Sequence, residues 1–299
     1  MTALRLAFVG ADGALGSTLV PRLGAHPVSL RCPTLDDTST VEGLDRFEVV
    51  IHAAGPRVHP GLRWGDYLRE HVGTTRKVAR SMVPGSHLVL VSSAAVYGSN
   101  RGPVTPASPP LPDTFPVPPY AWAKLVAEDT ARAMAAERGL ALTILRPSII
   151  YGPGAGGVIL TLRDLARRGV RVELLPGSMR QHLLQIALFQ RVLEGLVAAT
   201  PPPRPLTFDV ADPFVVATSE LNATYARVAP SVPAVPVPVG RLADALRLWQ
   251  RRAGRGAPGS VAVAAMLGLD NVYDPRPCLD HLGIDPRPFG REGFDAFLG

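Results

Sequence analysis

The chain has 299 residues, of which 46% are hydrophobic and 19% charged, so it can bury a large core in one domain, or in one domain and a smaller lobe. Its formal net charge of +6 suits an anionic ligand. Nucleic-acid binding is not expected, because the arginines are scattered and no basic run alternates with aromatic residues.

Membrane segments, secretion signals and metal sites are not expected either. No apolar run is long enough to cross a bilayer, and residues 4–9 are too short for the apolar core of a signal peptide. The two cysteines, Cys32 and Cys278, lack metal-binding spacing, and no cluster of His, Asp or Glu replaces them. We therefore expect a cytoplasmic protein without a metal ion.

The first 150 residues alternate between strand-like and helix-like segments. Apolar runs predict strands at residues 4–9, 28–30, 48–52, 87–92 and 141–145. Helical spacing predicts helices at residues 14–23, 64–82 and 120–138. Because the strands are continuously apolar, we predict the α/β class: a Rossmann-type, doubly wound parallel sheet with a smaller C-terminal lobe.

A glycine motif follows the first predicted strand and opens the first predicted helix. Such a turn brings a helix N-terminus close to the pyrophosphate of a dinucleotide, although a tight strand-to-helix turn needs glycines as well. In this context dinucleotide binding is favoured over a purely structural turn. The expected cofactor contacts in the turn are Gly10, Asp12, Gly13, Ala14, Leu15 and Gly16.

Ser93, Tyr120 and Lys124 form a second constellation. Ser93 follows a predicted strand, and Tyr120 and Lys124 lie one turn apart on one helix face. A free tyrosine has a pKa of about 10, too high for proton exchange near neutrality, and we expect the Lys124 ammonium to lower it. Ser93 would hold the substrate oxygen, as hydride transfer to a carbonyl requires. A solvated Tyr–Lys pair is the alternative, but the chain has only two lysines, so a chance pairing is rare.

The proline-rich segment from Pro103 to Pro119 contains eight prolines, so it is predicted to be a surface loop. It leads directly into the helix of Tyr120. After residue 205 the pattern is less regular. We predict a dinucleotide-binding domain over residues 1–155, and expect residues 156–299 to complete the sheet domain and build a substrate-binding lobe.

Together these motifs resemble the extended short-chain dehydrogenases/reductases, the NAD(P)-dependent epimerase/dehydratase family. The resemblance covers at least residues 4–154, and residues 282–289 extend it weakly. It is carried by the glycine motif, the pair Tyr120 and Lys124, and residues 49–55 (VVIHAAG), 91–98 (VSSAAVYG) and 145–154 (LRPSIIYGPG). These motifs specify the superfamily well and the substrate poorly.

The resemblance implies a homodimeric enzyme and assigns roles. Tyr120 exchanges the proton, Ser93 and Tyr97 contact the substrate, and Lys124 also holds the nicotinamide ribose. The further cofactor contacts that it implies are Ala53, Ala54, Gly55, Val91, Ser92, Pro147, Ser148 and Ile149. Packing of strand ends is the alternative for these small residues.

The sequence departs from the family at three places. His71 stands where the family usually carries Asn, and we expect a packed helix histidine. Near residues 180–187 the family often has a segment that starts with Arg-Asp and ends with Asp. Here only Arg180 of that pattern is present. This arginine either contacts a substrate phosphate or is solvated. The segment between residues 28 and 49 is short, which leaves Leu35 and Asp36 as adenine contacts.

Arg31 bears on the choice of cofactor. NAD enzymes usually place an acid after the second strand, whereas here Arg31 suits a 2′-phosphate, so NADP is preferred over NAD. The expected substrate is a nucleotide sugar, reduced or epimerised at a keto or hydroxyl carbon. The alternatives are an NADPH-dependent reductase of a non-nucleotide ketone and a non-catalytic dinucleotide-binding sensor; the intact trio argues against the sensor.

Overall fold

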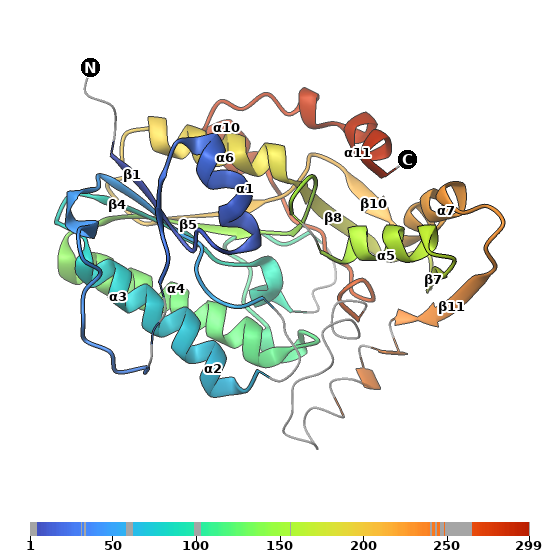
Figure 1. The fold of residues 1–299 in the computed structure, drawn as a ribbon, viewed down its shortest axis with the longest axis horizontal. Helices are drawn as coiled ribbons and strands as arrows, with labels where there is room; N and C mark the ends of the chain where they lie inside the picture. Colours follow the sequence, from blue (N-terminus) through green and yellow to red (C-terminus); the bar gives the residue numbers. More distant parts are fainter. Residues whose placement is uncertain are drawn as a thin grey trace.

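The computed structural model is built around a six-stranded parallel sheet (Figure 1). It describes residues 5–298, except residues 31, 33, 58–61, 99–102, 156, 240, 243, 246, 247 and 249–264. The strands lie in the order β2 (His26–Val28), β1 (Leu6–Val9), β3 (Val49–His52), β4 (His87–Val91), β5 (Ala141–Pro147) and β9 (Leu206–Val210). All neighbouring strands in this sheet are parallel, so the predicted α/β class and Rossmann-type sheet are confirmed.

Helices cover both faces of the sheet. Phe8 and Ile51 pack with Leu19 and Phe189 on one face, and alternate strand residues such as Val50 pack on the other. Figure 1 shows the two helical layers on opposite sides of the strands. The first layer is α1 (Ala14–Leu23) and α6 (Ile186–Ala198); the second is α2 (Trp64–Leu68), α3 (Thr74–Ser81) and α4 (Pro118–Arg138). A π-helical turn, η2 (Arg69–Gly73), joins α2 to α3.

A smaller lobe follows β5, at the right in Figure 1. One small sheet contains β6 (Ile149–Tyr151), β8 (Arg180–Gln185) and β10 (Val215–Ala217), and another pairs β7 (Arg171–Leu175) with β11 (Ala234–Pro238). The lobe's helices are α5 (Val158–Arg167), α7 (Thr218–Val228) and α11 (Arg291–Leu298); α10 (Arg276–His281) packs near β9. Because β9 returns to the main sheet, both halves of the chain build that sheet. Among the described helices, none is long and apolar enough to cross a bilayer.

The segment between β2 and β3 contains one short 3-10 helix (Leu44–Arg46) and no strand in its described part. The main sheet therefore ends at β2 on this side. The loop after β2 is tied to α3 instead, because Lys77 Nζ lies 2.9 Å from Asp37 Oδ2 and Arg76 donates to the Leu35 carbonyl. In its described part, the segment between β2 and β3 is therefore a loop with a 3-10 helix that packs on α3.

A buried ion pair fixes α4 to the sheet. Glu128 of α4 is 0% exposed and Arg146 of β5 is 5% exposed, and two hydrogen bonds of 2.9 and 2.6 Å join them. Ser92, after β4, donates to the same carboxylate at 2.6 Å. Burial alone would raise the pKa of Glu128, but Arg146 and Ser92 bring it below its usual value. The carboxylate is therefore charged and satisfied, as a buried ion must be.

We expect loss of either partner of this pair to destabilise the fold by about 3–5 kcal/mol, because the other charge would stay buried and unpaired. The variants are Glu128→Gln and Arg146→Met, measured by urea unfolding. Replacing both residues together, as Glu128→Leu with Arg146→Met, should recover part of the loss. Arg132, which pairs with the same carboxylate from a site 36% exposed, is the control, and Arg132→Ala should cost less than about 1 kcal/mol. Single variants that cost no more than this control would contradict the assignment.

Candidate active site

The glycine turn lies between β1 and α1 at the carboxyl edge of the sheet. Gly10 has a φ of +97°, and a Cβ there would lie 2.7 Å from the Ala54 backbone nitrogen. A Cβ on Gly16 would overlap the Gly10 carbonyl oxygen. Gly13 differs, because its Cβ would meet only the Gly10 oxygen, at 3.2 Å. Gly10 and Gly16 are therefore needed for the close packing of the turn itself, whereas the space beside Gly13, outside the turn, is open.

Helix α1 begins at this turn with features that fit a phosphate. Gly13 is its N-cap, no side chain caps it, and its first turn carries no acid. Unpaired N–H groups at such a helix end attract anions. Ala53, at the end of β3, donates to the Val9 carbonyl, which brings the two strand ends together at the turn. Asp12 is exposed and accepts a hydrogen bond from Ser29.

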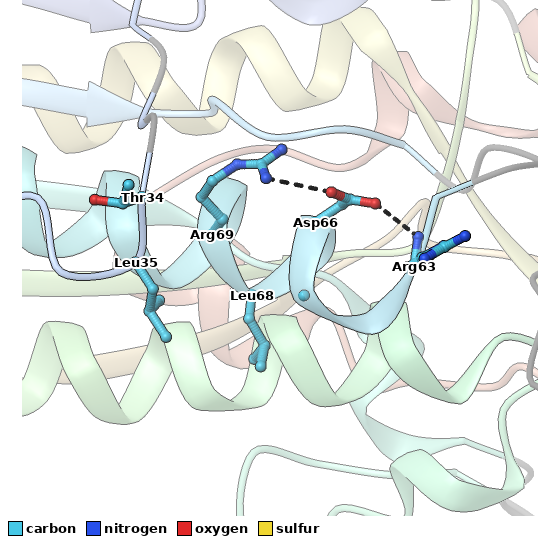
Figure 2. Close-up of a pocket in the computed structure, with 7 residues that line it drawn as sticks. Thr34, Leu35, Arg63, Asp66, Leu68 and Arg69 are labelled. Atoms are coloured by element: carbon cyan, nitrogen blue, oxygen red, sulfur yellow. Dashed lines mark hydrogen bonds and ion pairs between the residues drawn. The ribbon is translucent and has the colours of Figure 1, made fainter.

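The predicted adenine contacts lie at the loop after β2. Leu35 lines an open pocket of about 410 Å³ together with Thr34, Arg63, Gly65, Asp66, Leu68 and Arg69 (Figure 2). Within it, Arg69 pairs with Asp66 at 3.3 Å, and the Asp66 carboxylate also accepts from the Arg63 backbone nitrogen. Arg31, the residue that favoured NADP, lies outside the described residues, and Asp36 is exposed beside Leu35.

The structure brings Ser93 and Tyr120 together. Ser93 follows β4 as the N-cap of the 3-10 helix η3 (Ala94–Tyr97), and Tyr120 lies in the first turn of α4. The Ser93 hydroxyl lies close enough to the Tyr120 phenol to lower its pKa. A serine and a phenol at the carboxyl end of a parallel strand can together hold a carbonyl oxygen.

Lys124 lies one turn deeper along α4 and is buried. Its Nζ donates to the Val91 carbonyl at 3.0 Å, and burial lowers its pKa to about 8, against the opposing effect of Glu128. The predicted lowering of the Tyr120 pKa by Lys124 is wrong for this arrangement. Burial raises the Tyr120 pKa, and the groups that lower it are Ser93 and Arg57. Because Lys124 lies one helix turn after Tyr120, its ammonium reaches the end of β4, at Val91, instead of the phenol.

Three residues that were predicted to contact the substrate or the cofactor have their polar groups hydrogen-bonded within the protein. Tyr97 is buried; its hydroxyl donates to Asp209 at 2.8 Å and accepts from Arg146 at 2.7 Å. The structure therefore places Tyr97 in the buried network, away from any surface where a substrate could reach its hydroxyl. The Ser92 hydroxyl is taken by Glu128 and the Val91 carbonyl by Lys124.

Ser148 fits the predicted cofactor role better. It lies between β5 and β6, next to Pro147 and Ile149, and its backbone nitrogen donates to Val210. Its hydroxyl oxygen is buried and has no hydrogen-bond partner in the part of the chain that the structure describes. Such an atom is costly unless a ligand completes it. Together with the room outside Gly13, it shows that the residues present fit a dinucleotide.

Arg180, at the start of β8, is partly committed to another residue. Its side chain is 49% exposed and pairs with Asp270 at 3.0 Å, and Asp270 also accepts from its backbone nitrogen. A phosphate would therefore compete with Asp270 for this guanidinium. No cluster of three or more potential metal ligands occurs among the residues that the structure describes.

Sequence reasoning missed Glu128 and Arg146, which position the helix of the trio. Glu128 continues the Tyr120 and Lys124 spacing by four more residues, so it shares their helix face. Arg146 interrupts an apolar strand, which indicates a buried partner. The spacing of Glu128 and the position of Arg146 in an apolar strand can both be read from the sequence, but neither shows that the two residues pair with each other.

The chain is similar to known proteins in sequence and in fold. The model of the NAD dependent epimerase/dehydratase family matches residues 7–182. The uncharacterized protein y4nG of Sinorhizobium fredii is 32% identical over 112 residues, which are 37% of this chain and 27% of that protein. MoeE5 in complex with UDP-glucuronic acid and NAD superposes with a TM-score of 0.73 at 22% identity, over 98% of this chain and 96% of that one. Human epimerase family protein SDR39U1 with NADPH gives 0.72 at 20% identity, over 99% and 98%.

Two buried carboxyl groups near the site predict a pH dependence of stability. Burial raises the pKa of Asp209 and of Asp212 from 3.8 to about 7. The folded protein therefore binds more protons than the unfolded chain between these values, so their contribution to stability is lost as the pH rises through this window.

We expect Asp212→Asn, which mimics the protonated acid, to remove one such contribution. Between pH 4 and 7, wild type should lose up to about 1.4 kcal/mol per pH unit relative to this variant. Urea unfolding across this range measures the difference. Asp129→Asn, at an exposed carboxylate, is the control and should follow wild type. Parallel pH profiles of wild type and Asp212→Asn would show that Asp212 ionises normally.

Proposed function

Because the chain belongs to the NAD-dependent epimerase/dehydratase family, we propose that it is an NAD(P)-dependent oxidoreductase acting at a keto or hydroxyl carbon. The observation that carries this proposal is the position of Ser93, after β4, beside Tyr120 in the first turn of α4, the helix whose next turn holds the buried Lys124. A non-catalytic dinucleotide-binding sensor would need the glycine turn alone. The lobe built from residues after 155 would bind the substrate.

The proposed mechanism assigns one task to each residue. The nicotinamide, when bound, supplies or accepts the hydride. The N-terminus of α1 and Gly13 would hold the pyrophosphate, and Ser148 the nicotinamide end. Ser93 orients the substrate oxygen, and Tyr120 gives a proton to that oxygen or takes one from it. Burial opposes ionisation of the Tyr120 phenol, and Arg57 favours it. The groups around the bound dinucleotide would also affect how much of the phenol is ionised.

For the cofactor we favour NADP. Arg31 would meet a 2′-phosphate, and the pocket in Figure 2 adds Arg63 near Leu35, at the loop where adenine is expected, whereas Arg69 there is paired with Asp66. Human SDR39U1 carries NADPH, whereas MoeE5 carries NAD. NADP in turn favours net ketoreduction over epimerisation, because an epimerase returns its hydride to the substrate.

For the substrate we favour a nucleotide sugar. Support comes from the net charge of +6 and from the fold similarity to MoeE5, a structure with UDP-glucuronic acid. The second candidate is a non-nucleotide ketone, and the pairing of Arg180 with Asp270 favours it, because this arginine is not free for a phosphate.

Tyr120→Phe tests the mechanism. We expect turnover to fall about 10²-fold or more, because only the proton-exchanging hydroxyl is removed. Binding of NADPH and of NADH, measured by fluorescence titration, should be the same in the variant as in wild type. In both proteins NADPH should bind more tightly than NADH. Tyr225→Phe is the matched control, because this buried hydroxyl donates to the Ile159 carbonyl, in the lobe. Near-normal turnover in Tyr120→Phe would exclude Tyr120 as the proton donor.

Calorimetry with UDP and dTDP, at saturating cofactor, tests the substrate class. We expect binding tighter than millimolar, weakened by about 1.5–3 kcal/mol in Arg180→Ala if this guanidinium leaves Asp270 for a phosphate. Arg191→Ala, at an exposed arginine paired with Glu194, is the control. Millimolar or weaker binding of both nucleotides, without turnover of a keto-sugar nucleotide, would favour the non-nucleotide ketone.

A further inference from the structure

Three aromatic rings surround the ring of Tyr120, and we name them the aromatic clamp: His71, Tyr67 and Phe115. The ring centroids of His71 and Tyr120 are 5.6 Å apart with planes at 77°, and those of Tyr67 and Tyr120 are 5.9 Å apart at 75°. The ring centroid of Phe115, in the proline-rich segment, lies 6.3 Å from that of Tyr120 with planes at 37°. Edge-to-face pairs of this kind have a preferred geometry. The clamp therefore fixes the direction of the Tyr120 ring.

His71 is the member of the clamp with the most constrained position. It lies in the π-helical turn between α2 and α3, is 2% exposed, and stacks on Tyr67 with planes 7° apart. A Cβ on Gly55, whose φ is +123°, would overlap His71 Nδ1. The end of β3 therefore has glycine where the imidazole needs the space.

The surroundings of His71 also favour its neutral form. The Pro56 carbonyl acts to raise the pKa of the ring, and Nε2 is buried without a hydrogen-bond partner among the described residues. Burial, Lys124 and His52 hold the pKa of His71 well below its usual value. His71 is therefore a neutral ring beside the phenol.

We propose that His71 is a positioning residue for Tyr120. The imidazole ring of His71 shields the phenol from water and directs it at Ser93. The inference rests on the proposed function of Tyr120 and goes beyond it, because the family's usual Asn at this position would supply no ring to the clamp. An Asn would leave Tyr67 and Phe115 alone to hold the phenol. Tyr120 is partly buried, so its ring would then be more exposed to water, and the burial that raises the Tyr120 pKa would be reduced.

The first measurement is the titration of Tyr120 in the protein without added ligand. The ¹³Cζ resonance of labelled tyrosine, assigned with Tyr120→Phe, reports phenol ionisation directly. We expect the Tyr120 pKa to fall by roughly one unit or more in His71→Ala and His71→Asn, and to stay near wild type in His71→Phe, which keeps a ring. The charged or titratable groups around the pair are Lys124 on α4, Tyr67 on α2, His52 on β3 and Arg57 in the next loop, and none of them is changed.

The second measurement separates positioning from folding. Where a substrate is turned over, kcat should fall roughly 10- to 100-fold in His71→Ala with little change in KM, and His71→Phe should restore most of it. Urea unfolding of each variant shows whether the fold persists. An unchanged Tyr120 titration in a folded His71→Ala, or a His71→Phe that behaves like His71→Ala, overturns the proposal. A shifted titration in a protein that turns over no ketone or alcohol would instead refute the proposed function and leave the positioning role intact.

Discussion

The buried pair of Glu128 and Arg146 is the constraint on which the candidate site depends. It joins α4 to β5, and through Ser92 it also joins α4 to the end of β4. Because α4 carries Tyr120 and Lys124, a rotation or shift of this helix would separate the phenol from Ser93. Two charges are kept out of water for this purpose, at a desolvation cost that only complete hydrogen bonding offsets.

The same network explains why the residues near the site divide into two groups. Tyr97, Asp209 and Ser92 satisfy the buried charges and are therefore committed to the protein. Ser93, Tyr120 and Ser148 keep polar groups that a ligand can complete, at the carboxyl edge where the ends of β4 and β5 and the start of α4 meet. Parallel strands place such groups together because all of them end at one edge of the sheet.

The short segment after β2 changes the surroundings of the expected adenosine site. Where the main sheet ends at β2, the loop that follows is held by Lys77 and Arg76 of α3 rather than by another strand. The pocket of Figure 2 lies between this loop and α2. The residues that line it therefore come from the loop and from α2, and Arg69 among them is paired with Asp66 and Glu70.

The sequence by itself determined the elements and the family. Apolar strands, helical spacing and the Gly10 turn are patterns among near neighbours, so the sheet and its helices could be expected from them, and the resemblance to the family brought Ser93 and Tyr120 into one site. Only the tertiary structure decided which polar groups remain available, because those contacts join distant residues. The Tyr97 and Asp209 bond spans 112 positions and that of Arg146 and Tyr97 spans 49, and no local pattern marks either. The Tyr120 pKa was misjudged for the same reason. Lys124 is close in sequence, but its ammonium donates to the Val91 carbonyl, and burial, which depends on the whole fold, raises the pKa of the phenol.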